Sequence, residues 1–287
     1  MALAYIVSAY KLPEQLTRLV LRLSTEDSWF FIHVDRKTDD DVYRRMTRSL
    51  ASAANVRFLP RHACHYGGFG HVQATLKGID AIVRGGLSFD HTILLTGQDY
   101  PLKSNAEIHA FFRRRRGRSF MEHFSLPTTA WVRGGIERIT VWHVRVGGRH
   151  LRLRPRPRLG LARQFPAGLR PFGGSSYWCL SRDCTGYVHE FVRQNRRYTR
   201  FFRFVDVPDE LFFQTIVLNS PFRDDVVNDD LRYLEWRDPR VASGPAVLES
   251  RDFGKLASSG KLFARKFDAG RDSEVLDLLD VKIGAAS

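Results

Sequence analysis

Cysteine is scarce in this sequence, and its pattern excludes a disulfide framework. The 287 residues contain only Cys64, Cys179 and Cys184, and none of them forms a CxxC pair. No Cys/His group has the spacing along the chain that zinc ligands usually show. Such sparse use is typical of a reducing compartment. We expect all three cysteines to be small, buried hydrophobic side chains.

The sequence also lacks long apolar runs. No stretch approaches the roughly 20 residues that cross a bilayer, and the first residues lack the basic start of a secretory signal. Hydrophobic residues nevertheless make up 43% of the chain and aromatic residues 12%, which excludes a disordered protein. We expect a single domain over residues 1–287, with residues 126–172 forming an insertion or flexible face rich in Arg, Gly and Pro.

The common phosphate-binding and hydrolase motifs are missing as well. The sequence has no GxxxxGK[ST], no GxGxxG after its first predicted strand and no GxSxG. These absences argue against a P-loop ATPase, a dinucleotide-binding enzyme and an α/β-hydrolase. The acidic run Asp39–Asp41 contains a DxD pattern, but it begins a predicted helix. We interpret it as a helix N-terminus and not as a metal site.

What the sequence has in excess is positive charge. Lys and Arg number 45 against 31 Asp and Glu, a formal net charge of +14. Such a surplus favours an anionic partner, namely nucleic acid, a membrane surface or a phosphate-bearing substrate, and the alternative is a merely solvated Arg-rich surface. Arginines gather at 113–116 and over 145–170. Because Phe165 is the only aromatic residue of the second stretch, that stretch lacks the stacking platforms of a nucleic-acid-binding protein.

Apolar segments alternate with helical patterns through the first 125 residues. This order predicts an α/β fold with a mostly parallel central sheet and helices on both faces. The apolar runs are continuous, as expected for strands buried on both sides. Predicted strands lie at 4–8, 29–34, 56–59, 92–95 and 119–123, and predicted helices at 16–23, 39–50, 72–83 and 106–112.

Polar residues follow the predicted strands where a ligand site is expected. In an open parallel sheet, ligands bind beyond the carboxyl ends of the strands. His33 and Asp35 end the second strand, Asp99 follows the fourth, and Glu122 lies on the fifth. An isolated Asp at a strand end is commonly a cap or turn former. Acidic residues at several strand ends of one edge favour a functional site.

Two later segments of the sequence contain further candidate site residues. Glu210 lies in the first turn of a predicted helix and is followed by Leu-Phe-Phe. It is either a carboxylate stabilised by the helix dipole or a general base whose pKa is raised by apolar neighbours. Arg265 and Lys266 lie between Phe263 and Phe267. They either alternate along a surface strand or neutralise a diphosphate.

Eight segments in sequence order resemble one family. The chain is similar to glycosyltransferase family 14, which contains the core-2/I-branching β-1,6-N-acetylglucosaminyltransferases and the peptide O-xylosyltransferases. The resemblance covers nearly the whole chain. It is carried by AYIVSAY, FFIHVDRK, FGHVQATLKGI, LLTGQDYPLKSN, GGSSYWCLSR, VPDELFFQTIVLNS, LRYLEW and LFARKFD.

The resemblance implies a GT-A-like nucleotide-sugar transferase fold and an inverting transfer from a UDP-sugar. In this family the DxD metal motif is absent and basic residues meet the diphosphate, so no metal and no other cofactor is expected. By position, Glu210 matches the catalytic base. Arg265 and Lys266 match the diphosphate contacts.

The remaining site residues follow from the same motifs. His33, Asp35 and Asp99 fall in segments that line the nucleotide-sugar cleft. Glu122 aligns with a carboxylate that binds the acceptor, and Tyr177 and Trp178 follow the Gly-Ser of the acceptor-side motif.

The donor and acceptor stay open at this level. Xylosyltransferases place Asp-Trp where this chain has Ser176-Tyr177, which is nearer the N-acetylglucosaminyl branch, whereas FARKFD is nearer the xylosyl branch. We expect GlcNAc or xylose as the sugar. The expected acceptor is a glycan or a lipid-linked glycan.

The expected setting is a bacterial, cytoplasmic protein, because the anchor, stem and disulfides of animal members are not seen. The Arg-rich stretches suggest peripheral contact with anionic membrane at the inner face of the cell membrane. Nucleic acid is not an expected partner. The alternatives are a basic protein that binds nucleic acid or anionic membrane, and a catalytically inactive sugar-binding relative.

Overall fold

The computed structural model describes residues 1–146, 149–154, 163–236 and 244–284. Within them the apolar segments form a central sheet in the order β12-β6-β11-β4-β1-β2-β3. All neighbouring strands of this sheet are parallel except β11, which runs antiparallel to both β4 and β6. The strands are β1 (Leu3–Ala9), β2 (Ser28–Val34), β3 (Val56–Phe58), β4 (His91–Thr96), β6 (Ser119–Met121), β11 (Trp178–Ser181) and β12 (Val226–Val227).

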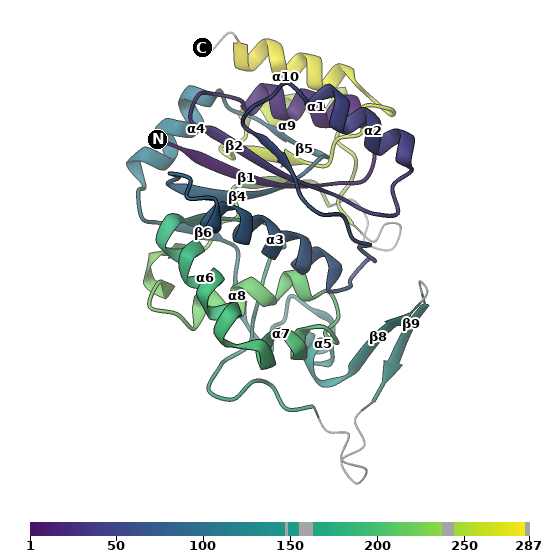
Figure 1. Cartoon of the computed structure of the whole chain (residues 1–287), viewed down its shortest axis with the longest axis vertical. Helices are drawn as coiled ribbons and strands as arrows, with labels where there is room; N and C mark the ends of the chain where they lie inside the picture. Colours follow the sequence, from purple (N-terminus) through teal and green to yellow (C-terminus); the bar gives the residue numbers. More distant parts are fainter. Residues whose placement is uncertain (147–148, 155–162, 237–243, 285–287) are drawn as a thin grey trace.

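Helices cover both faces of this sheet because successive side chains of a strand point to opposite faces. On β1, Leu3, Tyr5 and Val7 belong to one hydrophobic cluster, whereas Ala4 and Ile6 belong to another. Figure 1 shows the two layers of helices on either side of the sheet. The first layer contains α1 (Pro13–Leu23), α2 (Asp40–Ser49), α4 (Asn105–Arg114), α9 (Phe253–Ser258) and α10 (Glu274–Gly284), and the second contains α3 (Gly70–Arg84), α6 (Arg182–Gln194), α7 (Arg196–Phe202) and α8 (Phe212–Leu218).

Smaller elements surround the sheet. A three-stranded sheet joins β5 (Asp99–Pro101), β13 (Arg232–Leu234) and β14 (Phe263–Arg265), and it places Arg265 opposite Asp99. A hairpin of β8 (Trp142–Val146) and β9 (Arg149–Leu153) projects from the body of the molecule (Figure 1). The remaining elements are β7 (Phe124–Ser125), β10 (Phe172–Gly173), α5 (Glu137–Thr140), η1 (Val132–Gly135), η3 (Pro208–Glu210), η4 (Arg223–Asp225) and η5 (Ser250–Asp252).

These elements confirm the predicted α/β fold with a mostly parallel sheet. The acidic run is a helix N-terminus as predicted, because the Asp39 side chain accepts hydrogen bonds from the backbone N–H groups of Asp41 and Val42. The helix predicted to contain Glu210 in its first turn is divided, because Leu211 leaves the helical region at φ −135° between η3 and α8. No helix in the described ranges has both the length and the apolar content needed to cross a membrane.

Candidate active site

A cavity of about 930 Å³ opens where the strands of the central sheet end. Residues that follow β2, β4 and β6 line it, as expected from the topology of a parallel sheet. Seven of the nine predicted site residues are among the lining residues: His33, Asp35, Glu122, Tyr177, Glu210, Arg265 and Lys266. The predictions made from separate segments therefore converge on one cavity.

Glu210 lies in η3, which begins at Pro208, a residue suited to the first turn of a helix. Val207, just before it, has φ 45°, a rare conformation for a β-branched residue, and its N–H donates to the carbonyl of Gly67. Nη1 of Arg138 donates to Oε2 of Glu210 at 2.5 Å. Burial raises the pKa of Glu210 to about 6, whereas Arg138 acts to lower it. The carboxylate is therefore ionised at neutral pH yet basic enough to accept a proton.

The loop before β11 connects the two glutamates of the cavity. The N–H of Gly174 donates to the carbonyl of Glu210 at 3.0 Å. A Cβ at Gly174 would lie 1.9 Å from the carbonyl oxygen of Glu122, so only glycine fits there. Burial also raises the pKa of Glu122. Asp209 accepts a hydrogen bond from the hydroxyl of Ser176 at 2.8 Å, which holds the loop against η3.

Arg265 and Lys266 bring positive charge to the cavity from the end of β14. Arg265 donates to the hydroxyl of Thr96, lies 3.5 Å from Oδ2 of Asp99 and stacks 4.9 Å over the ring of Tyr177. Burial and the neighbouring Arg265 lower the pKa of Lys266. Within the described residues no carboxylate forms an ion pair with Lys266. Its ammonium group is therefore available to an anionic ligand.

His33 and Asp35 line the cavity from the end of β2. Asp35 accepts a hydrogen bond from the N–H of Lys37 at 2.9 Å. Nε2 of His33 lies 3.0 Å from Nδ1 of His62, and burial is the main cause that lowers the pKa of His33 to about 4. His33 is therefore uncharged at neutral pH.

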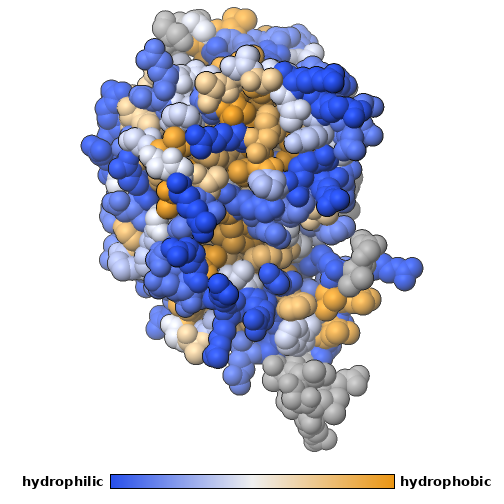
Figure 2. All heavy atoms as spheres, in the orientation of Figure 1, coloured by the Kyte–Doolittle hydropathy of each residue, from blue (hydrophilic) through white to orange (hydrophobic). Residues whose placement is uncertain are grey.

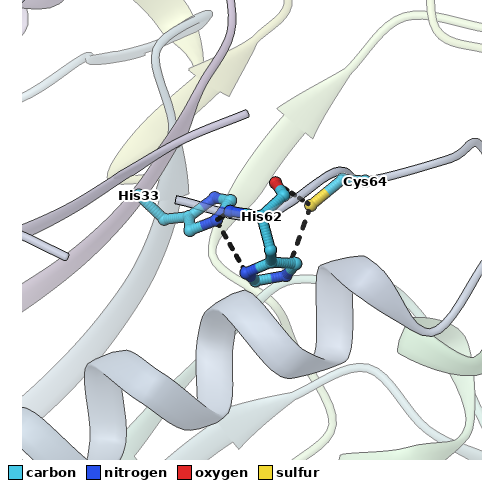
Figure 3. Close-up of side chains that lie close together, drawn as sticks. All are labelled: His33, His62 and Cys64. Carbon is cyan, nitrogen blue, oxygen red and sulfur yellow. Dashed lines mark hydrogen bonds between the residues drawn. The ribbon is translucent and has the colours of Figure 1, made fainter. Parts of the chain in front are cut away.

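His33, His62 and Cys64 bring three potential metal ligands together (Figure 3). His33 approaches Nδ1 of His62, whereas the sulfur of Cys64 lies 3.7 Å from Nε2 on the other side of the ring. One ion cannot use both nitrogens of one imidazole. Nδ1 of His62 also lies 3.0 Å from the ammonium group of Lys77. The cluster is therefore better described as a hydrogen-bonded chain than as a metal site.

Two predicted site residues do not reach the cavity. Asp99 is fully buried and accepts hydrogen bonds from the N–H and hydroxyl of Thr96, so its position serves Arg265. Trp178 is also fully buried, and its ring packs 5.2 Å from that of Phe213. Successive side chains of an extended chain point to opposite sides. Tyr177, just before β11, therefore faces the cavity, whereas Trp178 faces the core. Neither Asp99 nor Trp178 is among the residues that line the cavity, so we expect both to act on a ligand through their neighbours.

The sequence interpretation missed several lining residues. Lys11 follows β1 and forms an ion pair with Asp268 at 2.5 Å. Trp131 and Arg138 come from the stretch 126–172, and the guanidinium of Arg138 stacks 3.6 Å over the Trp131 ring. Part of the stretch expected to be an insertion or flexible face thus forms a wall of the cavity. The residues at 147–148 and 155–162 of this stretch lie outside the described ones.

The family model described as "Branch: Core-2/I-Branching enzyme" matches residues 3–257. The chain therefore belongs to the Core-2/I-Branching enzyme family, which confirms the resemblance found in the motifs.

Curated relatives agree with this assignment. Xylosyltransferase 2 of Rattus norvegicus and of Homo sapiens are each 28% identical over 293 residues, which cover 93% of this chain and 32% of each relative. Xylosyltransferase 1 of Homo sapiens is 26% identical, with 93% of this chain and 28% of that protein covered. The chain thus spans about a third of the length of these relatives.

A solved structure, a 4-diphosphocytidyl-2C-methyl-D-erythritol synthase from Anaerococcus prevotii, is similar over 68% of this chain and 76% of that chain. It has a TM-score of 0.33 and 9% identity. A likeness this low carries no functional information.

Proposed function

We propose that this chain is an inverting, metal-independent glycosyltransferase that moves GlcNAc or xylose from a UDP-sugar to a hydroxyl of a glycan or glycoconjugate. The observation that carries the proposal is Glu210, a carboxylate with a pKa of about 6 in a cavity that also holds Arg265 and Lys266. A base and cations in one cavity are what a displacement at a diphosphate-activated carbon requires. Membership of the Core-2/I-Branching enzyme family supports it.

The reaction is a single displacement. The Glu210 carboxylate takes the proton of an acceptor hydroxyl while that oxygen forms a bond to the anomeric carbon of the donor. The bond between this carbon and the diphosphate oxygen breaks, and UDP leaves with the electron pair. Lys266 and Arg265 meet the developing negative charge, so positive side chains take the place that a metal ion has in other transferases. Most of the rate enhancement comes from positioning and charge.

The other lining residues have supporting roles in this proposal. Glu122 and Tyr177 bind the acceptor near the base, and His33 and Asp35 contact the donor from the β2 side of the cavity. Asp99 and Trp178 act through their neighbours, Arg265 and Tyr177. The presence of the base and both cations favours an active enzyme over a sugar-binding relative that has lost catalysis.

We also infer peripheral contact with anionic membrane at the cytoplasmic face, where a lipid-linked glycan would be reached. The support is the β8–β9 hairpin, on which Leu151 and Leu153 are half exposed beside Arg149. Figure 2 shows apolar residues, bordered by hydrophilic ones, where this hairpin lies. Apolar side chains flanked by arginines suit an anionic lipid surface better than nucleic acid.

A binding screen tests the proposed donor. UDP-GlcNAc, UDP-xylose, UDP-glucose and UDP-galactose are titrated calorimetrically, each with and without EDTA. We expect UDP-GlcNAc or UDP-xylose to bind most tightly, with equal affinity in both conditions. Slow release of UDP from that donor in the absence of acceptor would separate an active enzyme from an inactive relative. No binding of any UDP-sugar, together with salt-dependent binding of generic DNA or RNA, would overturn the proposal in favour of a nucleic-acid-binding protein.

A further inference from the structure

A second cavity, of about 470 Å³, lies against one face of the β8–β9 hairpin, and three potential metal ligands line it. His143 comes from β8 and His150 from β9, and Asp206 lies shortly before η3. Hairpin pairing places Arg145 opposite His150 and His143 opposite Arg152, so both histidines lie on the same face of the hairpin. Three segments of the chain thus meet at one point.

The ligand atoms of these three side chains converge. Nδ1 of His143 lies 3.0 Å from Nε2 of His150. Oδ1 of Asp206 lies 3.8 Å from the first nitrogen and 3.9 Å from the second. Zinc bonds of about 2.0–2.2 Å in tetrahedral geometry separate ligand atoms by roughly 3.3 Å. The three atoms are therefore spaced nearly as one ion requires.

The protonation of His143 suits a ligand. Its other nitrogen, Nε2, lies 3.0 Å from the carbonyl oxygen of Glu137 and must carry the proton that it donates there. Nδ1 is then left with a lone pair directed at His150. A metal-bound histidine usually donates its second N–H in this manner, which fixes the tautomer and the ring.

The cluster in Figure 3 has a different arrangement of its ligand atoms. There, His33 and Cys64 approach different nitrogens of the His62 ring, and the ammonium group of Lys77 competes for one of them. At the hairpin each residue contributes one atom to a common point. Among the described residues, these are the two places where three His, Cys, Asp or Glu ligand atoms come together.

Positive charge near the hairpin cavity limits the affinity for a cation. Nη2 of Arg145 lies 2.5 Å from Oδ1 of Asp206 and competes for that oxygen. Arg133 and Arg152, by contrast, are paired with Glu137 at 2.7 Å and 2.8 Å. We expect binding weaker than at a closed structural site, with a water in the position that faces the cavity.

We propose that His143, His150 and Asp206 bind one divalent transition-metal ion, with zinc preferred, which fastens the β8–β9 hairpin to the segment leading into η3. Two imidazoles and a carboxylate are ligands that zinc accepts. The ion would connect β8, β9 and the residues before Glu210, and so would stabilise the folded state by binding it and not the unfolded chain.

Zinc titration of the untagged, metal-stripped chain tests this inference. We expect calorimetry to show one equivalent of zinc and the midpoint of thermal unfolding to rise with zinc. His150→Ala removes a ligand whose side chain is 35% exposed, so the fold is expected to tolerate it. Asp206→Asn provides a second variant. Each is expected to weaken zinc binding at least tenfold. A thermal unfolding transition, recorded for each variant without metal, shows that the variant is folded.

Two control variants make the result specific. His189→Ala removes a histidine that is paired with Asp80 at 2.9 Å, where the described residues offer no third ligand. His62→Ala disrupts the cluster in Figure 3. Both are expected to bind zinc as the unmodified chain does. Absence of saturable binding in the unmodified chain, unchanged binding in folded His150→Ala, or loss of binding in His62→Ala alone would overturn the proposal. These readouts do not depend on enzymatic activity.

Discussion

Arg138 and Glu210 lie 72 positions apart in the sequence, yet Nη1 of the arginine donates to Oε2 of the glutamate at 2.5 Å. Burial raises the pKa of a carboxyl group, because it disfavours the charged form. The guanidinium opposes that effect, and the resulting pKa is about 6. The proton affinity of the proposed base is therefore set by a residue from a stretch that the sequence marked only as rich in Arg, Gly and Pro.

The first prediction concerns the base itself. Glu210→Gln removes the proton acceptor and keeps nearly the same volume, so we expect sugar transfer to fall by roughly 10²–10⁴-fold, as is typical when a general base is lost. UDP binding, measured by calorimetry, is expected to persist. Glu190→Gln, at an exposed Glu that pairs with Arg193, is the control and should leave the rate unchanged. Undiminished turnover of Glu210→Gln would contradict the assignment.

The second prediction concerns pH. A base must be ionised to act, so activity is expected to decline as the pH falls through about 6, the pKa of Glu210. Arg138→Met removes the group that lowers this pKa, so the decline should move to higher pH. The check is the pH dependence of kcat. Arg133→Met, which breaks an exposed pair with Glu137, serves as the control. An unmoved profile for Arg138→Met would show that another group limits the rate.

The third prediction concerns the leaving group. Lys266→Ala removes an ammonium group that has no ion-pair partner among the described residues. A hydrogen bond to a charged group contributes about 1.5–3 kcal/mol, so UDP affinity should fall about 10- to 100-fold. Lys255→Ala, at an exposed lysine paired with Glu235, should leave affinity unchanged. Equal UDP affinity in the two variants would remove Lys266 from the donor site.

The fourth prediction concerns metal. Transfer is expected to continue in EDTA, because in the proposed mechanism Arg265 and Lys266 take the place of a metal ion at the diphosphate. His150→Ala distinguishes a metal requirement of the transfer reaction from an effect of the metal ion proposed at the hairpin. If EDTA slows the unmodified chain but has no effect on His150→Ala, the loss arises at the hairpin. Complete loss in EDTA in both proteins, restored by Mn²⁺, would contradict metal-independent transfer.

The fifth prediction concerns the membrane. Replacing Leu151 and Leu153 by Asp places charge on the exposed apolar face of the hairpin. We expect this double variant to lose co-sedimentation with anionic vesicles, whereas Leu21→Asp, at a leucine that is 61% exposed on α1, retains it. Equal sedimentation with neutral and anionic vesicles would exclude the inferred contact.

The strands and the edge that carries the site could be predicted because their signals are local. Continuous apolar runs mark β1, β2 and β4, and the carboxyl ends of parallel strands must share one edge. His33, Asp35 and Glu122 were found on this basis. Glu210 and Lys266 needed the family motifs as well, because a glutamate at a helix start and a lysine just after a short strand have ordinary structural explanations.

Other features could not be predicted because they depend on long-range packing. The antiparallel direction of β11 is decided by how the chain returns to the sheet. It brings the start of this strand, and with it Tyr177, to the edge of the sheet where β4 ends. The hairpin cluster is similar. His143 and His150 are close in sequence, but Asp206 joins them only in the folded chain. The spacing of these three residues along the sequence does not match that of known zinc motifs, so the sequence does not reveal the cluster.

Arg138 lines both cavities, so one side chain contacts both. A small anionic molecule that entered only the hairpin cavity and drew the guanidinium toward itself would leave Glu210 without its partner. The pKa of the base would then rise, although the donor site would be untouched. Such a compound would inhibit without competing with the nucleotide sugar, which offers a route to selectivity among enzymes that use the same donor.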